Sequence, residues 1–383
     1  MQNGPISFAD FMEMALYDLE EGYYTSPSIG QDFYTSPSAH PVFGALLAIQ
    51  LEDIWSLIGE PESFPVIELG AGRGTLGKDI QNYSSYLSPG FAKAIDYIPI
   101  EKHGGNIPAI PVEGCFLSNE LLDALPTHIV TQKNGSLMEV MVGIQDDSLV
   151  EVLMEPCPGV AEQLDKELNN GTGEKISLPE DYRTEVNLET PHLIAAVAKA
   201  LKRGVALTID YGYLASELYS PERRRGTLLC YYQHTYNEVP LLRGGCQDIT
   251  SHVDFTAIIR AGEKYSLSFD GLVTQREFFN NLGMQHFIRG LAGLGLSPLE
   301  YQANLYAMQE LIRPEGMGSF RVLVQSKGME GIKLKGLKHN IDSSYKPPVM
   351  VPKLREEHLP LYQAKYSLSE QIMGEELEQW PLI

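Results

Sequence analysis

Residues 61–75, PESFPVIELGAGRGT, decide the fold of this chain. The apolar run at 66–69 predicts a short buried strand, and Gly70, Gly72 and Gly74 predict a sharp turn ahead of a helix. Glycine suits this turn because the backbone must take tight or left-handed conformations and because a ligand can approach it with no Cβ in the way. The segment therefore predicts a strand, a ligand-binding loop and a helix.

Three kinds of ligand-binding loop resemble this pattern, and the neighbouring residues separate them. A phosphate-binding P-loop needs a hydroxyl after its lysine, but Lys78 is followed by Asp79, whose carboxylate cannot replace that Mg²⁺ ligand and would repel phosphates. A Rossmann dinucleotide loop needs a third glycine where Thr75 stands. Glu68, two residues before the first glycine, completes instead the pattern of S-adenosylmethionine (SAM) methyltransferases. SAM brings an amino group and a sulfonium to this turn, and a carboxylate attracts both cations.

A second acid stands in register with Glu68. The apolar run at 97–100 predicts the next strand, and Glu101 follows it directly, where a carboxylate can accept hydrogen bonds from both ribose hydroxyls. An ordinary strand-to-helix turn would explain a lone GxGxG motif. The two acids together favour a SAM site.

The composition indicates a large acidic protein. The chain has 383 residues and a mass of 42.5 kDa, long for one doubly wound domain, so insertions or a second lobe are expected. Its formal net charge of −21 disfavours nucleic acid and anionic membranes as partners and favours a cationic one. No run is apolar enough to span a bilayer, and the first Lys or Arg is Arg73, which argues against a transit peptide or secretory signal. We therefore predict a cytoplasmic protein without membrane insertion.

The cysteines and histidines predict no metal site. Cys115, Cys157, Cys230 and Cys246 are scattered without a CxxC motif, a pattern typical of reduced and mostly buried thiols. There is no HExxH motif, and no histidine pairs with a cysteine at zinc spacing. The absence of GxSxG removes support for a hydrolase nucleophile as well.

Two further apolar runs deliver polar residues to the predicted ligand edge. They are 112–117, followed by SNELLDALP at 118–126, and 205–209, followed by Asp210. In doubly wound sheets ligands lie beyond the carboxyl ends of the strands, so Asn119 and Glu120 are expected to face the transferred methyl group. Asp123 is ambiguous, because an acid in such a place more commonly stabilises the first turn of a helix.

The rest of the chain predicts a helical cap, insertions and an extension. Alternating apolar runs joined by Asn134-Gly135 indicate antiparallel hairpins. Helices are expected at 160–169 and 191–202, and further strands at 267–273 and 319–325. The predicted parts are an N-terminal helical cap at 1–60, a core at 61–326 with a β insertion at about 127–155 and a loop and helical insertion at about 213–312, and a C-terminal extension at 327–383.

Several motifs in one order resemble the MidA family of SAM-dependent methyltransferases, over most of residues 6–326. The landmarks are FMEMALYDLEEGYY at 11–24, IGQDFYTSP at 29–37, ELGAGRGTL at 68–76, SNELLDALP at 118–126, IDYGY at 209–213, QDITSHVDF at 247–255 and GMGSFRVL at 316–323. The family comprises bacterial and mitochondrial relatives of the complex I assembly-factor arginine methyltransferase. The tail after Lys327 lies outside the match.

The resemblance implies an α/β fold of the class I SAM-dependent methyltransferase type, a Rossmann-like doubly wound sheet with an N-terminal helical cap and inserted β-hairpin and helical segments. It also implies SAM as cofactor and a protein partner as substrate, which for the mitochondrial members is an arginine of a respiratory complex I subunit. The expected cofactor-binding residues are Glu68, Gly70, Gly72 and Gly74 at the methionine end, Glu101 at the ribose, and Thr75, Ser118 and Thr35. The expected catalytic residues are Asn119, Glu120 and Asp210, and the expected substrate-binding residues are Asp248, Asp254 and Tyr211.

An arginine acceptor would require nearby carboxylates. Methyl transfer is an in-line displacement, to which good alignment contributes roughly 7–11 kcal/mol. Arginine is a cation with a pKa of about 12 or more, so carboxylates reduce its repulsion by the sulfonium and orient the guanidinium. Glu120, Asp210, Asp248 and Asp254 are the candidates, and at least one of Asp248 and Asp254 is expected to bind backbone N–H groups instead.

Two other functions remain open. A small-molecule methyltransferase would have a closed, aromatic-lined pocket, and a non-catalytic assembly protein would bind SAM weakly or not at all. The intact Glu68, Glu101 and glycines argue against the assembly protein, and Thr75 argues against a nicotinamide enzyme.

Overall fold

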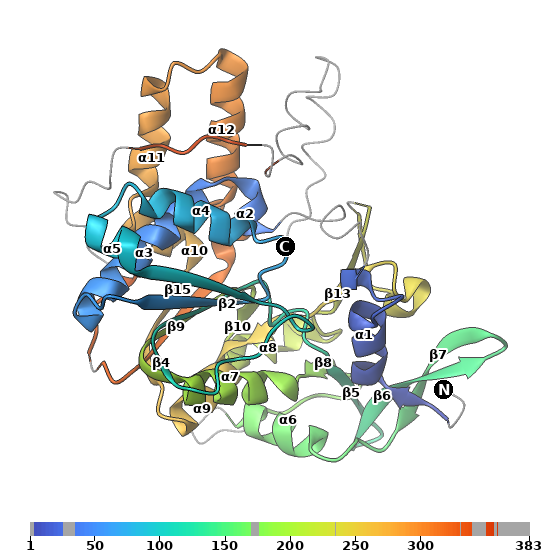
Figure 1. Cartoon of the computed structure of the whole chain (residues 1–383). Helices are drawn as coiled ribbons and strands as arrows, with labels where there is room; N and C mark the ends of the chain where they lie inside the picture. The colour runs from blue at the N-terminus through green and yellow to red at the C-terminus, as the bar shows by residue number, and fades with distance from the viewer. Residues whose placement is uncertain are drawn as a thin grey trace. The chain divides into compact units, whose positions relative to one another are not determined.

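The chain folds into two compact units. The computed structural model describes residues 4–25, 35–169, 176–233, 235–329, 331–338, 350–355 and 358 (Figure 1). One unit, which we call the sheet unit, comprises Tyr34–Asn119, Ala196–Asp210 and Gly262–Ile383. The other, the insert unit, comprises Met1–Phe33, Glu120–Ala195 and Tyr211–Ala261. The chain therefore leaves the sheet unit directly after Asn119 and again directly after Asp210.

The sheet unit is built on six strands in the order β15-β16-β9-β4-β2-β3. Their bounds are β2 (Phe64–Leu69), β3 (Ile95–Ile100), β4 (Val112–Asn119), β9 (Leu201–Asp210), β15 (Ser268–Thr274) and β16 (Arg321–Lys327). The pairs β2/β3, β2/β4 and β4/β9 are parallel, whereas β16 is antiparallel to β9 and β15. All six strands lie where the apolar runs predicted them. Because β2 has β3 on one side and β4 on the other, the strand order reverses there, which is where α/β sheets bind ligands.

The sheet unit also contains seven described α-helices. They are α2 (Ser36–Ala39), α3 (Val42–Ile58), α4 (Thr75–Ser84), α5 (Pro89–Ala94), α10 (Gln275–Asn281), α11 (Met284–Gly290) and α12 (Pro298–Glu310), with short 3₁₀ turns η4 (Leu291–Gly293), η5 (Met317–Ser319) and η6 (Lys335–Leu337). In Figure 1, α3, α4 and α5 lie along one face of the sheet. A Cβ on Gly44 of α3 would lie 2.4 Å from the Asp79 Cβ of α4, so only glycine allows these helices to pack this closely.

The insert unit contains an antiparallel sheet of β1 (Ile6–Ser7), β5 (His128–Lys133), β6 (Ser136–Gln145), β7 (Ser148–Met154) and β8 (Arg183–Val186). The predicted hairpins are confirmed: Asn134 and Gly135 have φ values of 52° and 76°, as a two-residue type I′ turn requires. Helix α1 (Phe8–Tyr17) begins after Ser7, whose side chain accepts a hydrogen bond from the Asp10 N–H group. Its apolar face shares a core with β5 and β6.

Shorter elements complete the described chain. They are α6 (Val160–Leu168), α7 (Glu189–Ala200), α8 (Ala215–Leu218), α9 (Phe255–Lys264), β10 (Gly212–Tyr213), β11 (Leu229–Tyr232), β12 (Thr235–Asn237), β13 (Asp248–Thr250), β14 (Val253–Asp254), η1 (Tyr23–Thr25), η2 (Pro221–Arg223) and η3 (Pro240–Arg243). The predicted helices at 160–169 and 191–202 correspond to α6 and α7. Among the described residues, no helix is long and apolar enough to cross a membrane.

The predicted domain boundaries need correction. Residues 1–60 are not one cap, because the apolar face of α1 packs in the insert unit whereas α3 belongs to the sheet unit. The second insertion spans 211–261 rather than about 213–312, since β15 and the helices after it belong to the sheet unit. Part of the expected extension also packs there, with Leu334 and Leu354 buried.

Candidate functional site

The glycine loop joins β2 to α4 at the carboxyl end of the sheet. Gly70, Gly72 and Gly74 have φ values of 73°, 54° and 70°, in the left-handed region that residues with a Cβ seldom adopt. The Gly70 N–H group donates to the Ile100 carbonyl oxygen at 2.8 Å, which ties the loop to β3. A Cβ on Gly72 or Gly74 would meet no described atom within 4 Å. The loop therefore presents its backbone to open space.

Glu68, one residue before the end of β2, is a buried acid. Its side chain accepts a hydrogen bond at Oε2 from the Tyr97 hydroxyl at 2.9 Å. Burial raises the pKa of Glu68 to about 7; the bond from Tyr97 lowers it and the charge of Glu101 adds to the rise. A cationic ligand would favour the ionised carboxylate and lower this pKa.

Glu101 stands on the other side of the same loop. It follows β3 directly, its side chain is exposed, and its Oε1 accepts a hydrogen bond from the backbone N–H group of Gly72. One carboxylate oxygen is thereby held at the loop. The two acids predicted from the sequence thus both lie next to the glycine turn.

The other predicted residues of the sheet unit lie at the ends of neighbouring strands or at the starts of helices at this edge. Ser118 is the register partner of Leu69, and Asn119 of Ile209, so the carboxyl ends of β2, β4 and β9 are level. Asp210 ends β9 and is fully buried. Thr75 is the first residue of α4, and Thr35 precedes α2, which packs against α4.

This donor set fits SAM. The open backbone of the loop can receive the methionine end, and Glu68 supplies the negative charge that an ammonium group needs. Glu101 lies beside the loop, where a carboxylate can bind ribose hydroxyls. These residues are the ones that would hold the cofactor.

The insert unit contains its own group of acids. Glu120, its first residue after Asn119, has a left-handed φ of 48°, a strained conformation that redirects the chain at the end of β4. Asp123 follows in a turn, not in the first turn of a helix as the sequence suggested, because no helix forms there. The Asp123 Oδ2 accepts a hydrogen bond from the hydroxyl of Tyr211, the residue after Asp210.

The Asp123 side chain is buried, and its two carboxylate oxygens differ in their hydrogen bonding. Its Oδ1 accepts no hydrogen bond of normal geometry from the described residues. Burial raises the pKa of Asp123 to about 6, while the Tyr211 hydroxyl and the backbone N–H groups of Ala124 and Asp123 keep the rise smaller. The carboxyl is therefore poised to bind a cation or to exchange a proton near neutral pH.

Tyrosines surround this acid and a second one, Asp248. The Tyr24 hydroxyl donates to the Asp248 Oδ1 at 2.9 Å, and the Tyr17 hydroxyl donates to the Ala124 carbonyl oxygen at 2.9 Å. Burial raises the pKa of Tyr17 and Tyr24 well above the ordinary value, and the charges of Asp248 and Asp123 add to it. We call Asp123, Asp248, Tyr17, Tyr24 and Tyr211 the acid–tyrosine cluster. The sequence predicted Asp248 and Tyr211, whereas Tyr17 and Tyr24 belong to the motif at 11–24 but were given no role.

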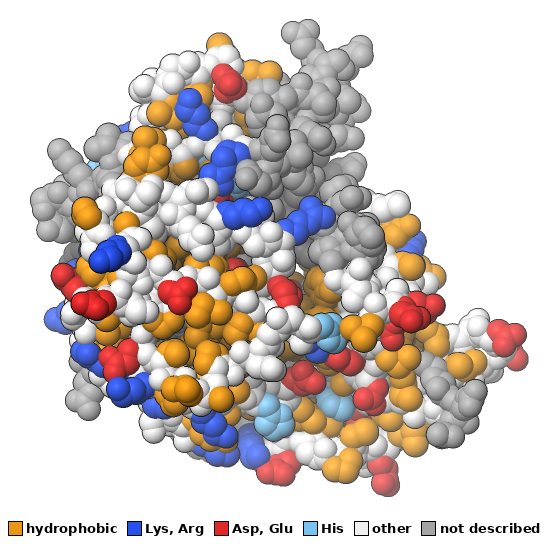
Figure 2. Space-filling view, in the orientation of Figure 1, with side chains coloured by type: hydrophobic (Ala, Val, Ile, Leu, Met, Phe, Trp, Pro, Cys, Tyr) orange, Lys and Arg blue, Asp and Glu red, His pale blue; other side chains and the backbone are white. Residues whose placement is uncertain are grey.

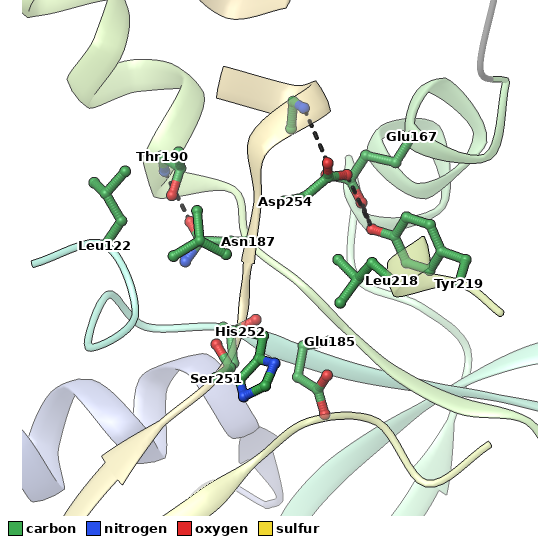
Figure 3. Close-up of a pocket in the computed structure, with 13 residues that line it drawn as sticks. Leu122, Glu167, Glu185, Asn187, Thr190, Leu218, Tyr219, Ser251, His252 and Asp254 are labelled. Atoms are coloured by element: carbon green, nitrogen blue, oxygen red, sulfur yellow. Dashed lines mark hydrogen bonds between the residues drawn. The ribbon is translucent and has the colours of Figure 1, made fainter. Parts of the chain in front are cut away.

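Asp254, one of the expected substrate-binding residues, lies at the start of a helix. Its Oδ1 accepts hydrogen bonds from the N–H groups of Thr256 and Ala257, at 2.8 and 3.2 Å, so it caps the start of α9. Figure 3 shows it beside Glu167 and Tyr219, on the wall of a cavity of about 30 Å³, room for roughly one water molecule. The expectation that at least one of Asp248 and Asp254 would bind backbone N–H groups is therefore confirmed for Asp254, and the Asp248 Oδ1 also accepts a hydrogen bond from the Ile249 N–H group, at 3.0 Å.

His252, on the wall of the same cavity, was singled out by no sequence prediction. Its ring packs against Tyr211 and Tyr213, with centroids 5.4 and 5.3 Å away. Burial lowers the pKa of His252 to about 4, so the ring stays neutral at physiological pH. In the space-filling view, acidic and histidine side chains appear over β8 and α6 (Figure 2).

The fold and the glycine loop define a SAM-dependent methyltransferase, and comparison with known proteins specifies the family. A family model described as "Putative S-adenosyl-L-methionine-dependent methyltransferase" matches residues 46–105 and 104–273, more than half of the chain. The chain belongs to this family, SAM is its cofactor, and the resemblance to the MidA family is confirmed.

Named relatives and solved structures agree with this assignment. The mitochondrial protein arginine methyltransferase NDUFAF7 of Mus musculus is 26% identical over 362 residues, which cover 82% of this chain and 79% of that protein. Its Drosophila melanogaster homolog is 27% identical and covers 69% and 68%. A Burkholderia thailandensis protein crystallised with S-adenosyl-homocysteine has a TM-score of 0.72 and 27% identity, covering 89% of this chain and 92% of that one. A native structure from the same organism gives 0.73 and 28%.

The relatives also correct one prediction. The expected cytoplasmic location is wrong by this comparison, because the NDUFAF7 relatives are mitochondrial proteins. The prediction rested on the lack of basic residues before Arg73, and that composition gives no positive information about a compartment.

Proposed function

We propose that this enzyme transfers the methyl group of SAM to an arginine side chain of a protein and that the acid–tyrosine cluster binds the acceptor. The observation that carries the proposal is the Asp123 carboxylate, buried and with an Oδ1 that accepts no hydrogen bond of normal geometry from the described residues. A guanidinium group offers five N–H donors and a positive charge. It can therefore supply the hydrogen bond that the Asp123 Oδ1 lacks. The names of the NDUFAF7 relatives support the same acceptor.

The cluster follows the cofactor edge of the sheet closely in sequence. Asp123 is four residues beyond Asn119, which ends β4. Tyr211, which donates to Asp123, is the residue directly after Asp210 of β9. Both strand ends belong to the sheet edge that carries the glycine loop.

Bound SAM supplies an electrophilic methyl group on a sulfonium. The role of the protein is then to align the acceptor nitrogen and to compensate its charge. Asp123 and Asp248 would hold the guanidinium, and Asp123, with a pKa of about 6, would accept the proton that the nitrogen releases. Tyr211 would orient the Asp123 carboxylate through its hydrogen bond.

We further propose the class I fold type, a doubly wound sheet in which the first strand lies between the second and third. The β3-β2-β4-β9 order supports it, with β16 antiparallel at the far side. A respiratory complex subunit as the acceptor protein rests on the family resemblance alone. Glu120 and Asn119 keep their expected place near the methyl group in this proposal.

The test is transfer of tritiated methyl from SAM into proteins of a cell lysate, followed by amino-acid analysis for methylarginine. Asp123→Asn keeps the shape and the bond from Tyr211 but loses the charge, so we expect the rate to fall about 10- to 100-fold with unchanged SAM affinity. Tyr211→Phe, which removes only the orienting bond, should give a smaller fall. A rate for Asp123→Asn within about threefold of wild type would reject the cluster as the acceptor site.

The same experiment separates the other candidate functions. Label in small molecules rather than in protein would indicate a small-molecule methyltransferase. If the wild-type protein bound no SAM, Glu68, Glu101 and the glycines would not form a working cofactor site. The non-catalytic assembly protein would then be the remaining candidate function.

A further inference from the structure

A group of three chemically different ligand atoms lies in the insert unit. His128 begins β5, Glu139 lies in β6, and Cys157 stands in the segment between β7 and α6. One nitrogen, one carboxylate oxygen and one sulfur of these residues all lie within 4.8 Å of one another. The sequence predicted no metal site because His128 and Cys157 are far apart in the chain. We propose that these residues bind a divalent transition-metal cation, for which Zn²⁺ is the best match.

The sheet places the first two ligands on one face. Val130 and Glu139 are register partners in the antiparallel pair β5/β6, and His128 is two residues from Val130. Since side chains alternate along a strand, His128 and Glu139 point to the same side of the sheet as diagonal neighbours. The His128 Nδ1 lies 2.7 Å from the Glu139 Oε1.

The third ligand is fixed by backbone hydrogen bonds. The Cys157 N–H group donates to the Glu139 Oε2 at 2.5 Å, and the Val160 N–H group donates to the Cys157 carbonyl oxygen at 3.2 Å at the start of α6. The Glu139 carboxylate is therefore oriented by both other ligand residues. A cation bound here would join α6 to the β5/β6 hairpin.

The donor set matches the chemistry of zinc. Zn²⁺ is bound by imidazole nitrogen, thiolate sulfur and carboxylate oxygen at about 2.0–2.3 Å, and three protein ligands leave a fourth position for water. Tetrahedral ligands at these lengths are about 3.4 Å apart, so the 2.7 Å distance between nitrogen and oxygen needs to open by less than about 1 Å. Glu139 is fully buried, whereas His128 and Cys157 are partly exposed, so a cation can enter from solvent.

The local charges favour a cation. The Glu139 carboxylate contacts both other ligand residues, and Asp10 is a second acid close enough to Cys157 to act on it electrostatically. A metal ion bound here would compensate both carboxylates.

The test uses the full-length protein stripped with EDTA and titrated with Co²⁺. We expect one Co²⁺ per chain, a thiolate-to-cobalt charge-transfer absorption, and displacement by Zn²⁺. Cys157→Ser retains the backbone bond to Glu139, so it should fold, lose the absorption and weaken Zn²⁺ binding on the order of 100-fold. Cys246→Ser is the matched control, because the exposed Cys246 lies outside the cluster and its loss should change neither readout.

Two results would overturn the proposal. One is the absence of the absorption in wild type at one equivalent of Co²⁺, which would leave His128 and Glu139 as a hydrogen-bonded pair only. The other is an absorption that survives Cys157→Ser. Both readouts are independent of methyl transfer, so the outcome does not depend on the proposed acceptor.

Discussion

The glycine loop of the sheet unit and the acid–tyrosine cluster of the insert unit are both organised around carboxylates, but the chain assembles them differently. In the loop, Glu68, the three glycines and Thr75 are neighbours in sequence, and only Glu101 comes from elsewhere. In the cluster, the hydrogen bonds from Tyr211 to Asp123 and from Tyr24 to Asp248 join residues that are 88 and 224 positions apart.

This difference separates what local sequence determines from what tertiary structure determines. The loop depends on backbone conformations that only glycine adopts easily, so the glycines in the sequence predict it. The cluster depends on which turn follows β4 and on which helix brings Tyr17 and Tyr24 to it. Asp123 alone looks like any acid after a strand.

The largest effect is expected for the loop. Gly72 has a φ of 54°, and valine there would be strained and would place a branched side chain in the space beside the loop. We expect Gly72→Val to weaken SAM binding on the order of 100-fold, measured by calorimetric titration. The strain also displaces the N–H group that bonds Glu101, so both ends of the cofactor are affected.

Gly135→Val is the matched control for this variant. Gly135 also has a left-handed φ, 76°, and open space around it, but it lies in the β5/β6 turn. It should lower stability without changing SAM affinity. Equal loss of SAM affinity in both variants would show that the effect is general destabilisation, and the local character of the loop would be refuted.

A smaller effect is expected from pH. Because burial raises the pKa of Glu68 to about 7, the acid is mostly neutral below that pH and mostly ionised above it. The cationic cofactor binds the ionised form, so SAM affinity should rise as pH increases toward 7, by up to about tenfold per pH unit. Calorimetry from about pH 5.5 to about pH 7 avoids titration of the amino group of SAM, which begins near 7.7.

Glu68→Gln tests whether this pH dependence belongs to Glu68. The amide cannot ionise, so its SAM affinity should be weaker than that of wild type at pH 7 and flat over the same range. If SAM affinity still rises with pH in Glu68→Gln, the titrating group is not Glu68. The cofactor loop would then not depend on the charge of its buried acid.

The sheet was predictable because its strands are apolar runs bounded by polar residues. All six strands of the sheet unit, the hairpin at Asn134-Gly135, and helices α6 and α7 lie where the pattern put them. The strand β8 was missed because it is short and its partner, β5, lies 50 residues earlier. The cap was placed wrongly because amphipathicity shows that α1 has an apolar face but not which surface covers it.

The site divides in the same way. Glu68, Gly72 and Glu101 were found from their spacing, and the structure brings them to one loop. The role of Asp123 was left ambiguous, since no signal in the sequence shows that no helix follows it. The trio of His128, Glu139 and Cys157 has no spacing rule at all, because a strand register and a loop create it.

The smallest effect is expected for Asp254, which the sequence grouped with Asp248 as a substrate residue. Asp254 caps α9 through the N–H groups of Thr256 and Ala257, and asparagine caps helices as well as aspartate does. Asp254→Asn should therefore leave both methyl transfer and the free energy of unfolding nearly unchanged, the rate within about twofold, whereas Asp254→Ala should lower stability by about 1 kcal/mol. Asparagine at position 248 or 123 should not preserve methyl transfer in this way, because binding of a guanidinium requires the negative charge. A large loss of methyl transfer in Asp254→Asn at unchanged stability, measured by denaturant unfolding, would move Asp254 into the acceptor site and extend the cluster to the start of α9.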